Sequence, residues 1–284
     1  MLVYSSPRET LTAVRQARAR GQVIGCVPTM GALHPGHSSL IQRARLECDF
    51  VVATIFVNPT QFGPNEDFSR YPRTLEADLE ICRDSGADLV FTPNVSDMYA
   101  ANAETLVRVS QLSTILEGAH RPGHFDGVTT VVSKLFLITD PDRAYFGQKD
   151  FQQQLIIRRM VRDLNFPIEI VTCPIIRESD GLAMSSRNRY LAPAERETAR
   201  ALSQALTVAQ ALATDPQQTP QSIEEKLQER LQGTAGIDLQ YAVVVDTETL
   251  SALAARPSNG LAVALIAARV GTTRLLDNQL LVFS

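Results

Sequence analysis

Residues 23–57 decide the fold of this chain. They comprise VIGCV (Val23–Val27), PTMGALHPGH (Pro28–His37), SSLIQRAR (Ser38–Arg45) and, four residues later, FVVATIFV (Phe50–Val57). Two apolar runs rich in β-branched residues flank a polar loop and an amphipathic segment. Apolar runs of this length are typical of parallel strands covered on both faces. The stretch therefore predicts a strand, a loop, a helix and a second strand parallel to the first.

The same alternation continues to about residue 176. The apolar run over 128–138 has a helical spacing but is also compatible with a strand, and both interpretations stay open. Such alternation predicts a doubly wound, Rossmann-like parallel sheet over residues 1–176, an α/β fold. Within it we expect helices over 75–84 and 152–164, strands over 88–91 and 168–171, and a loop after Arg143–Phe146.

Residues 177–284 have a different pattern. Helical periodicity over 193–213 and 222–231 is followed by strand-like runs over 241–245 and 260–270. This order predicts a smaller α+β C-terminal domain. A second domain agrees with the length of 284 residues, which exceeds what one small core usually needs.

Composition excludes several classes of protein. The chain is 44% hydrophobic and 20% charged, and its formal net charge of -4 argues against a general nucleic-acid or membrane-surface binder. No apolar run approaches the ~20 residues that span a bilayer, and the N-terminus lacks a secretory pattern. The four cysteines form no C-x-x-C pair, which disfavours a disulfide framework or a zinc site. We expect Cys26 and Cys173 to be buried thiols and the protein to be cytoplasmic.

The first polar loop, Pro28–His37, lies where open α/β sheets bind ligands. Gly31 and Gly36 allow a ligand to approach the backbone, and the following helix would present free N–H groups to an anion. His34 and His37 are three apart, so they share one face if the helix has begun. Two imidazoles there suit a triphosphate. A turn with two solvated histidines is the alternative.

A second loop, Asn58–Gly63, follows the second strand. Asn58 and Gln61 carry hydrogen-bond donors and acceptors, as a hydroxy acid requires, although a plain polar turn around Pro59 remains an alternative. The next segment, Pro64–Pro72, has the composition of an active-site lid.

Two further segments are candidates for phosphate binding. In Phe146–Asp150, Lys149 can place a charge on phosphate, and Asp150 is a helix cap, a ribose ligand or both. Gln153 lies three residues beyond Asp150 and faces the same way. In Asp180–Arg189, two hydroxyls beside arginines form a phosphate clamp, with a solvated linker as the alternative.

Common catalytic motifs are missing from the sequence. It contains no G-x-S-x-G, H-E-x-x-H, G-x-G-x-x-G or Walker loop. A carboxylate is already an anionic nucleophile, so its activation by ATP requires only in-line placement at the α-phosphate and stabilisation of the departing pyrophosphate. The residues therefore predict an ATP-binding enzyme that activates a small carboxylic acid as an acyl-adenylate.

Together these segments resemble one family, the pantoate–β-alanine ligases or pantothenate synthetases, within the HxGH nucleotidyltransferase superfamily. The resemblance is strong over residues 20–190 and weak beyond, as far as Leu276-Asp277-Asn278. The matching segments are Pro28–His37, Phe56–Phe62, Tyr71–Thr74, Gly123–Val128, Phe146–Asp150 and Asp180–Tyr190.

The resemblance implies a reaction in two steps. Pantoate and ATP give pantoyl-adenylate and pyrophosphate; β-alanine then attacks the acyl carbon and gives pantothenate and AMP. It further implies a homodimer that requires Mg²⁺, which would ride on the ATP phosphates without a protein metal site. Residues 1–176 would bind ATP and pantoate, and residues 177–284 would close over the active site.

The resemblance also implies a role for individual residues. His34, His37 and Lys149 would be catalytic, with His37 stabilising the charge on the leaving pyrophosphate. Gln61 and Gln153 would bind pantoate, and Gln61 would also bind β-alanine. ATP would be bound by Met30, Gly31, Ala32, Leu33, His34, Pro35, Gly36, His37, Gly147, Gln148, Lys149, Asp150, Ile176, Met184, Ser185, Ser186 and Arg187.

One departure and two alternatives remain. Gln148 stands where many members have Glu, which we expect to be tolerated. Some members continue into a cytidylate kinase, which this sequence does not contain; it is either free-standing or an excerpt. The alternatives are a nucleotidyltransferase that acts on a phosphate and a non-catalytic nucleotide-binding module. Gln61 and Gln153 argue against the first, because a phosphate would favour arginine or lysine there.

Overall fold

The computed structural model describes residues 1–64 and 66–283. The chain divides into two compact units. The first unit consists of Met1–Gln148 and Gln152–Pro174. The second consists of Lys149–Phe151 and the chain from Ile175 onward.

The first unit is built on a six-stranded parallel sheet in the order β1-β4-β3-β2-β5-β6. Strand β2 pairs with β3 on one side and β5 on the other, so the strand order reverses between β2 and β5. Such a switch point opens a crevice at the carboxyl ends of the strands, where ligands bind. The strands are β1 (Leu2–Tyr4), β2 (Ile24–Thr29), β3 (Phe50–Ile55), β4 (Leu89–Phe91), β5 (Arg143–Gly147) and β6 (Glu169–Cys173).

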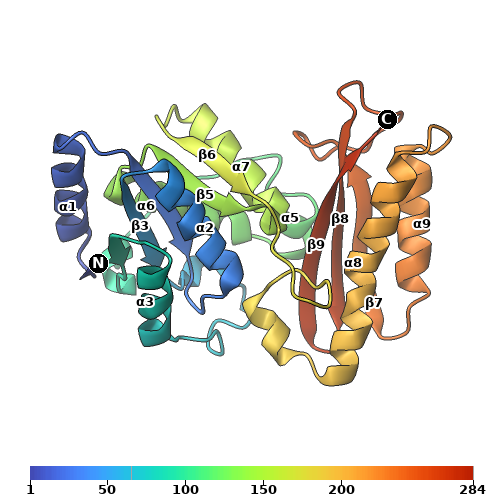
Figure 1. Cartoon of the computed structure of the whole chain (residues 1–284), viewed down its shortest axis with the longest axis horizontal. Coiled ribbons are helices and arrows are strands. Elements are labelled where there is room, and N and C mark those ends of the chain that lie inside the picture. Colours follow the sequence, from blue (N-terminus) through green and yellow to red (C-terminus); the bar gives the residue numbers. More distant parts are fainter. Residues whose placement is uncertain (65, 284) are drawn as a thin grey trace. The chain divides into compact units, whose positions relative to one another are not determined.

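Helices cover both faces of this sheet (Figure 1). Helices α2 (Pro35–Glu47) and α3 (Leu75–Asp84) pack on one face around buried Ile41, Val51 and Cys82. On the other face Phe136 makes edge-to-face contacts with Phe146 and Phe166. Full burial of a side chain of this size stabilises the folded state by ~1.5–3 kcal/mol compared with leaving the side chain exposed. The face that contains Phe136 is covered by α1 (Pro7–Ala19), α6 (His124–Thr139) and α7 (Phe151–Asp163). Two shorter helices, α4 (Val95–Met98) and α5 (Glu117–His120), also belong to this unit.

The second unit is an antiparallel sheet, β7 (Ile237–Val245), β8 (Leu261–Val270) and β9 (Thr273–Val282), in the order β7-β8-β9. Helices α8 (Pro193–Ala213) and α9 (Pro220–Gln232) pack on one face of it, around a core that includes Leu202, Leu227 and Ile266. All residues of this core belong to the second unit.

The predicted fold class, a Rossmann-like parallel sheet with a smaller α+β part, is confirmed. The open interpretation of residues 128–138 resolves to helix α6. Both strands predicted in the C-terminal part are present, as β7 and β8, but the sequence patterns did not predict the third strand, β9. Its apolar run is interrupted by Asp277 and Asn278, which are buried through hydrogen bonds rather than through apolarity.

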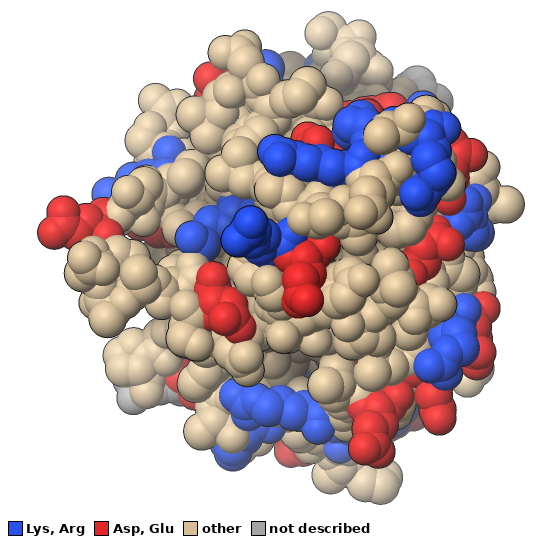
Figure 2. Space-filling view, turned by 90° about the vertical axis from the view of Figure 1, so that its left-hand side faces the viewer, with Lys and Arg blue, Asp and Glu red and all other residues tan. Residues whose placement is uncertain are grey.

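Surface charges are of mixed sign. On the face drawn in Figure 2, lysine and arginine side chains are interspersed with aspartate and glutamate. Ion pairs such as Arg18–Asp142 at 2.9 Å and Arg45–Asp88 at 2.7 Å are part of this pattern. Within the described residues, no helix combines the length and apolarity needed to cross a membrane. All four cysteines are free and buried, which confirms the prediction for Cys26 and Cys173.

Candidate active site

The first predicted loop leaves β2 through a left-handed turn. Gly31 has φ +79° and Ala32 has φ +50°, a conformation that costs little for glycine but is strained for alanine. The turn brings the chain to His34, which begins α2 at the switch point of the sheet. The sequence therefore placed this loop correctly at the carboxyl end of β2.

His34 and His37 form the N-terminal cap of α2. The His34 Nδ1 accepts the N–H of Gly36 at 3.2 Å, and the His37 Nδ1 accepts the N–H of His34 at 3.3 Å. These bonds form a capping box. An Nδ1 that accepts a hydrogen bond carries no proton, so each ring is neutral with its proton on Nε2. The two ring centroids lie 4.1 Å apart, so the two Nε2–H groups belong to neighbouring rings.

The same bonds correct one expectation. The first turn of α2 was expected to present free N–H groups to an anion, but the N–H of Gly36 is bonded to His34 Nδ1 and that of His37 to the His34 carbonyl at 2.8 Å. The histidine cap and the first turn of α2 therefore occupy these backbone donors.

The second predicted loop contains η1 (Pro59–Gln61), where Asn58 and Gln61 have different roles. Asn58 is 1% exposed; its Nδ2 donates to the Gly127 carbonyl at 3.1 Å, and its Oδ1 accepts from Tyr99 at 2.8 Å. Asn58 thus holds the loop rather than presenting an amide to a ligand. The Gln61 Oε1 accepts from Asn58 at 3.2 Å, and the Gln61 Nε2 reaches the Met30 sulfur at 3.0 Å.

A buried histidine fixes the backbone of Gln61. The His124 Nδ1 lies 2.8 Å from the Gln61 carbonyl, and its Nε2 lies 3.1 Å from Arg121 Nη1. A carbonyl only accepts and a guanidinium only donates, so His124 is neutral and carries its proton on Nδ1. Burial, and secondarily the charge of Arg121, lowers the His124 pKa to about 4. The sequence alone indicated no role for the motif Gly123–Val128, because Gln61, which His124 holds, lies in a loop that is distant along the chain.

Further contacts hold the predicted lid. The segment Pro64–Pro72 includes Asn65, which lies outside the described residues. Glu66 pairs with Arg121 at 2.6 Å, and Phe68 packs edge-on against Phe62 at 5.3 Å between ring centroids. Burial alone would raise the Glu66 pKa, but the Arg121 hydrogen bonds outweigh it and lower that pKa. The Glu66–Arg121 pair ties the described part of the segment to the C-cap of α5.

The three glutamines of α7 separate into two roles. Gln152 donates to the Leu112 and Ile115 carbonyls at 2.7 and 2.8 Å, and Gln154 accepts from Thr172 at 3.1 Å. Both are buried, whereas Gln153 is half-buried in the first turn of α7. Gln153 is thus the one of the three that remains a candidate for ligand contact. Gly147, the last residue of β5, and Gln148, which follows it, are both half-buried.

Lys149 belongs to the second unit, together with Asp150. The Asn278 Nδ2 donates to the Lys149 carbonyl at 2.8 Å. Next to it on β9, Asp277 accepts two hydrogen bonds from Arg177, at 2.7 and 3.0 Å. These bonds join the predicted phosphate lysine to the strand and to the segment that starts at Arg177.

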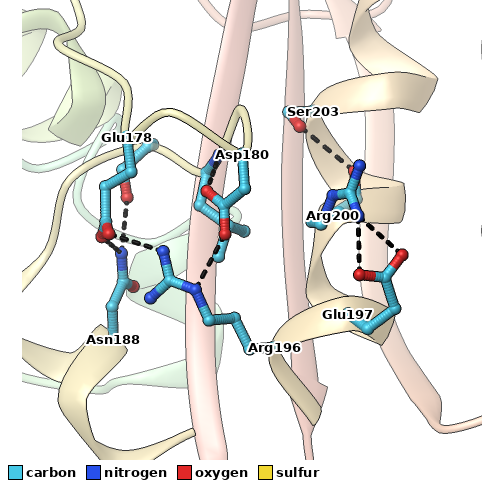
Figure 3. A network of polar contacts seen from close by, with 9 residues as sticks. Glu178, Asp180, Asn188, Arg196, Glu197, Arg200 and Ser203 are labelled. Carbon is cyan, nitrogen blue, oxygen red and sulfur yellow. Dashed lines mark hydrogen bonds and ion pairs between the residues drawn. The ribbon is translucent and has the colours of Figure 1, made fainter. Parts of the chain in front are cut away.

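The predicted phosphate clamp, Asp180–Arg189, lies in the same unit. A network of hydrogen bonds holds this segment (Figure 3). Ser185 accepts the N–H of Arg187 at 3.3 Å, and η3 (Ser186–Tyr190) follows it. Asn188 donates to Glu178 at 2.6 Å. Arg196 of α8 joins Glu178, at 2.5 Å, to Asp180, at 2.8 Å.

Ile176 and Met184, both predicted ATP contacts, are paired with one another. The Met184 N–H donates to the Ile176 carbonyl at 2.9 Å. That carbonyl is therefore already engaged within the protein. The Ile176 side chain is 37% exposed, which leaves it accessible for an apolar contact with a base.

A family model for pantoate-beta-alanine ligase matches residues 3–280. The chain belongs to this family. It is 51% identical over 277 residues to the pantothenate synthetase of Moorella thermoacetica, with 96% of this chain and 97% of the relative covered. It is 55% identical over 258 residues to that of Acidobacterium capsulatum, with 91% and 86% covered.

Solved structures of the ligase family share the fold. The pantothenate synthetase of Thermus thermophilus superposes with a TM-score of 0.92 at 45% identity, covering 98% of this chain and 99% of that one. The pantoate-beta-alanine ligase of Francisella tularensis, complexed with beta-gamma ATP and beta-alanine, gives 0.79 at 35% identity, covering 99% and 97%.

Proposed function

We propose that this chain condenses pantoate with β-alanine in an ATP-dependent reaction that passes through a pantoyl-adenylate. The observation that supports this proposal most directly is the arrangement of side chains at the switch point of the sheet. Two imidazole Nε2–H donors lie on the loop after β2, and the Gln61 amide is bonded to Met30 of that loop. Membership of the ligase family and the ATP and beta-alanine bound to the Francisella relative support the assignment.

The first step requires charge stabilisation rather than proton transfer. A pantoate carboxylate oxygen attacks the α-phosphorus, and the bond to the bridging oxygen breaks with both electrons leaving on pyrophosphate. The Nε2–H groups of His34 and His37 would donate to phosphate oxygens as their charge grows. Loss of such a donor typically costs ~10²–10³ in rate. Lys149 and Met184–Arg187 would add donors from the second unit.

The second step uses the same acid site. The β-alanine nitrogen attacks the acyl carbon, the bond to the AMP oxygen breaks, and the amine loses a proton. Gln61 and Gln153 would hold pantoate, with Gln61 also near β-alanine. The nucleotide would contact Met30–His37 and Gly147–Asp150, with Ile176 at the adenine. We propose that the second unit closes over the nucleotide during this sequence.

Magnesium would enter as the counter-ion of ATP. Among the described residues, no group of three or more His, Cys, Asp or Glu side chains is arranged to hold a metal ion. We propose that the ion is coordinated mainly by phosphate oxygens. Bound there, magnesium would neutralise part of the phosphate charge.

Assembly and compartment complete the proposal. Strand β6 lies at the edge of the sheet beside a groove of about 530 Å³, lined by apolar Val161, Phe166, Ile168 and Ile170 and by polar Arg158, Arg162 and Asn165. An edge strand next to apolar side chains favours pairing with a second copy, as a homodimer requires. Sedimentation of wild type and Ile170→Lys tests this. The four free thiols favour a reducing compartment such as the cytoplasm.

The catalytic proposal has a direct test. With pantoate but no β-alanine, the enzyme should exchange labelled pyrophosphate into ATP; with all three substrates it should form pantothenate and AMP in equal amounts. Exchange that does not depend on pantoate, or a stable dinucleotide in place of AMP, would overturn it.

A further inference from the structure

The turn between β2 and α2 points its backbone N–H groups at a carboxylate of the protein itself. The Ala32 N–H donates to Asp78 Oδ2 at 2.9 Å, and the Leu33 N–H donates to Asp78 Oδ1 at 2.8 Å. Successive N–H groups in such a turn form a concavity that binds anions. Here a side chain of α3, 46 residues away, fills it.

Asp78 is built into the interior and held from its own helix. It is 1% exposed, and Thr74 Oγ1 donates to its Oδ1 at 3.2 Å. A Cβ on Gly31 would lie 2.9 Å from Asp78 Oδ2, so the turn packs directly on the carboxylate. The Gly31 N–H is also used, by Thr29 Oγ1 at 3.2 Å.

The filled turn determines where His34 lies. Ala32 is held in the left-handed region although it carries a side chain, and the two Asp78 bonds fix it there. His34 follows within two residues, and its N–H binds His37 Nδ1. A shift of the turn therefore shifts both rings.

We propose that Asp78 is a positioning residue for adenylate formation. It acts through Ala32 and Leu33 to hold the His34 and His37 rings, and it occupies the anion site of the turn itself. The inference rests on the proposed function of the His34–His37 loop and adds a residue of α3 to it.

The test is Asp78→Asn, which keeps the shape but leaves one N–H facing an amide N–H₂. Pantoate-dependent pyrophosphate exchange should fall about 10²-fold, the usual effect of a small misplacement of catalytic groups. Aminolysis of added pantoyl-adenylate by β-alanine, which releases no pyrophosphate, should stay within about threefold of wild type. Glu76→Gln, an exposed acid in the same turn of α3, should leave both reactions unchanged.

A double-mutant cycle gives the second readout. If Asp78 acts through the rings, Asp78→Asn combined with His34→Ala should lose little more exchange than His34→Ala alone. Equal loss of exchange and aminolysis, additive losses in the double variant, or normal exchange in Asp78→Asn would each overturn the inference. Absence of pantoate-dependent exchange in wild type would instead overturn the proposed function.

Discussion

The Gln61 side-chain nitrogen donates to the sulfur of Met30 at 3.0 Å. This bond links the loop after β3 to the loop after β2. A thioether is a weak acceptor, so a carboxylate or hydroxyl oxygen would displace it readily. Because the Gln61 oxygen is already bonded to Asn58, the amide is oriented with its N–H available for an acid.

Gln61→Glu should therefore weaken pantoate use specifically. The substitution keeps the size but replaces the donor by a carboxylate, which repels an anionic substrate. We expect kcat/KM for pantoate to fall about 10²-fold, from the loss of a charge-assisted hydrogen bond. The Kd for ATP, measured by calorimetry, should change little. Gln42→Glu, on the exposed side of α2, is the control; equal loss of ATP binding in Gln61→Glu would contradict the assignment.

The two nitrogens of His37 have separable roles. His37→Asn can keep an acceptor near the Nδ1 position, which caps α2, but loses the Nε2–H donor. We expect pyrophosphate exchange to fall ~10²–10³-fold, with ATP affinity and melting temperature close to wild type. His37→Ala should lose the exchange and also some stability, because the cap is removed as well. Near-normal exchange in either variant would remove His37 from the mechanism.

Local patterns predicted part of this structure well. The predicted helix over 193–213 and that over 75–84 have the bounds seen in α8 and α3, since periodicity and helix signals are local. The spacing of His34 and His37 likewise placed both rings together. The supports of the site could not be predicted. Asp78 on an amphipathic helix has the pattern of a solvated acid, and only the tertiary fold brings it to Ala32.

His124 should make stability depend on pH. Burial, and then the charge of Arg121, lowers the His124 pKa from an ordinary 6.5 to about 4, against the opposing effect of Glu66 and Glu117. Between these values the unfolded chain binds one more proton than the folded one, so stability falls as pH drops from 6.5 towards 4. The full shift corresponds to roughly 3 kcal/mol. Urea unfolding at pH 7 and 4.5 should show this loss.

Two histidine variants test whether His124 causes this pH dependence of stability. His124→Asn retains a donor for the Gln61 carbonyl but does not titrate, so its unfolding free energy should vary less over this range. His120→Asn, at an exposed position four residues earlier, should behave like wild type. Wild-type pH dependence in His124→Asn would show that other groups cause it.

Asn278 should support Lys149 without touching substrate. Asn278→Ala removes the donor to the Lys149 carbonyl and frees that segment from β9. We expect kcat/KM for ATP to fall about tenfold, the cost of one buried hydrogen bond, with KM for pantoate nearly unchanged. Gln279→Ala, the next residue on the strand, is the control. Parallel changes in both variants would indicate general damage to β9.

The arginines of α8 offer a matched pair for the phosphate clamp. Arg196 bridges Glu178 and Asp180, and Glu178 in turn holds Asn188 at the end of the clamp (Figure 3). Arg200, one turn later, bonds Glu197 within the same helix. Breaking a shared network costs more than breaking a surface pair.

Arg196→Gln should therefore raise KM for ATP about tenfold and lower the melting temperature by several degrees, because a partly buried network of charged hydrogen bonds is worth ~1–3 kcal/mol. Arg200→Gln should change neither. Burial alone would raise the Asp180 pKa, but the Arg196 hydrogen bond outweighs it and lowers that pKa. The Asp180 pKa should therefore rise in Arg196→Gln. The unfolding free energy of Arg196→Gln should then fall less than that of wild type as pH drops through the acid range, because the Asp180 carboxylate in the folded variant no longer has a lowered pKa. If both variants bind ATP alike, the network supports the fold of the second unit but not the clamp.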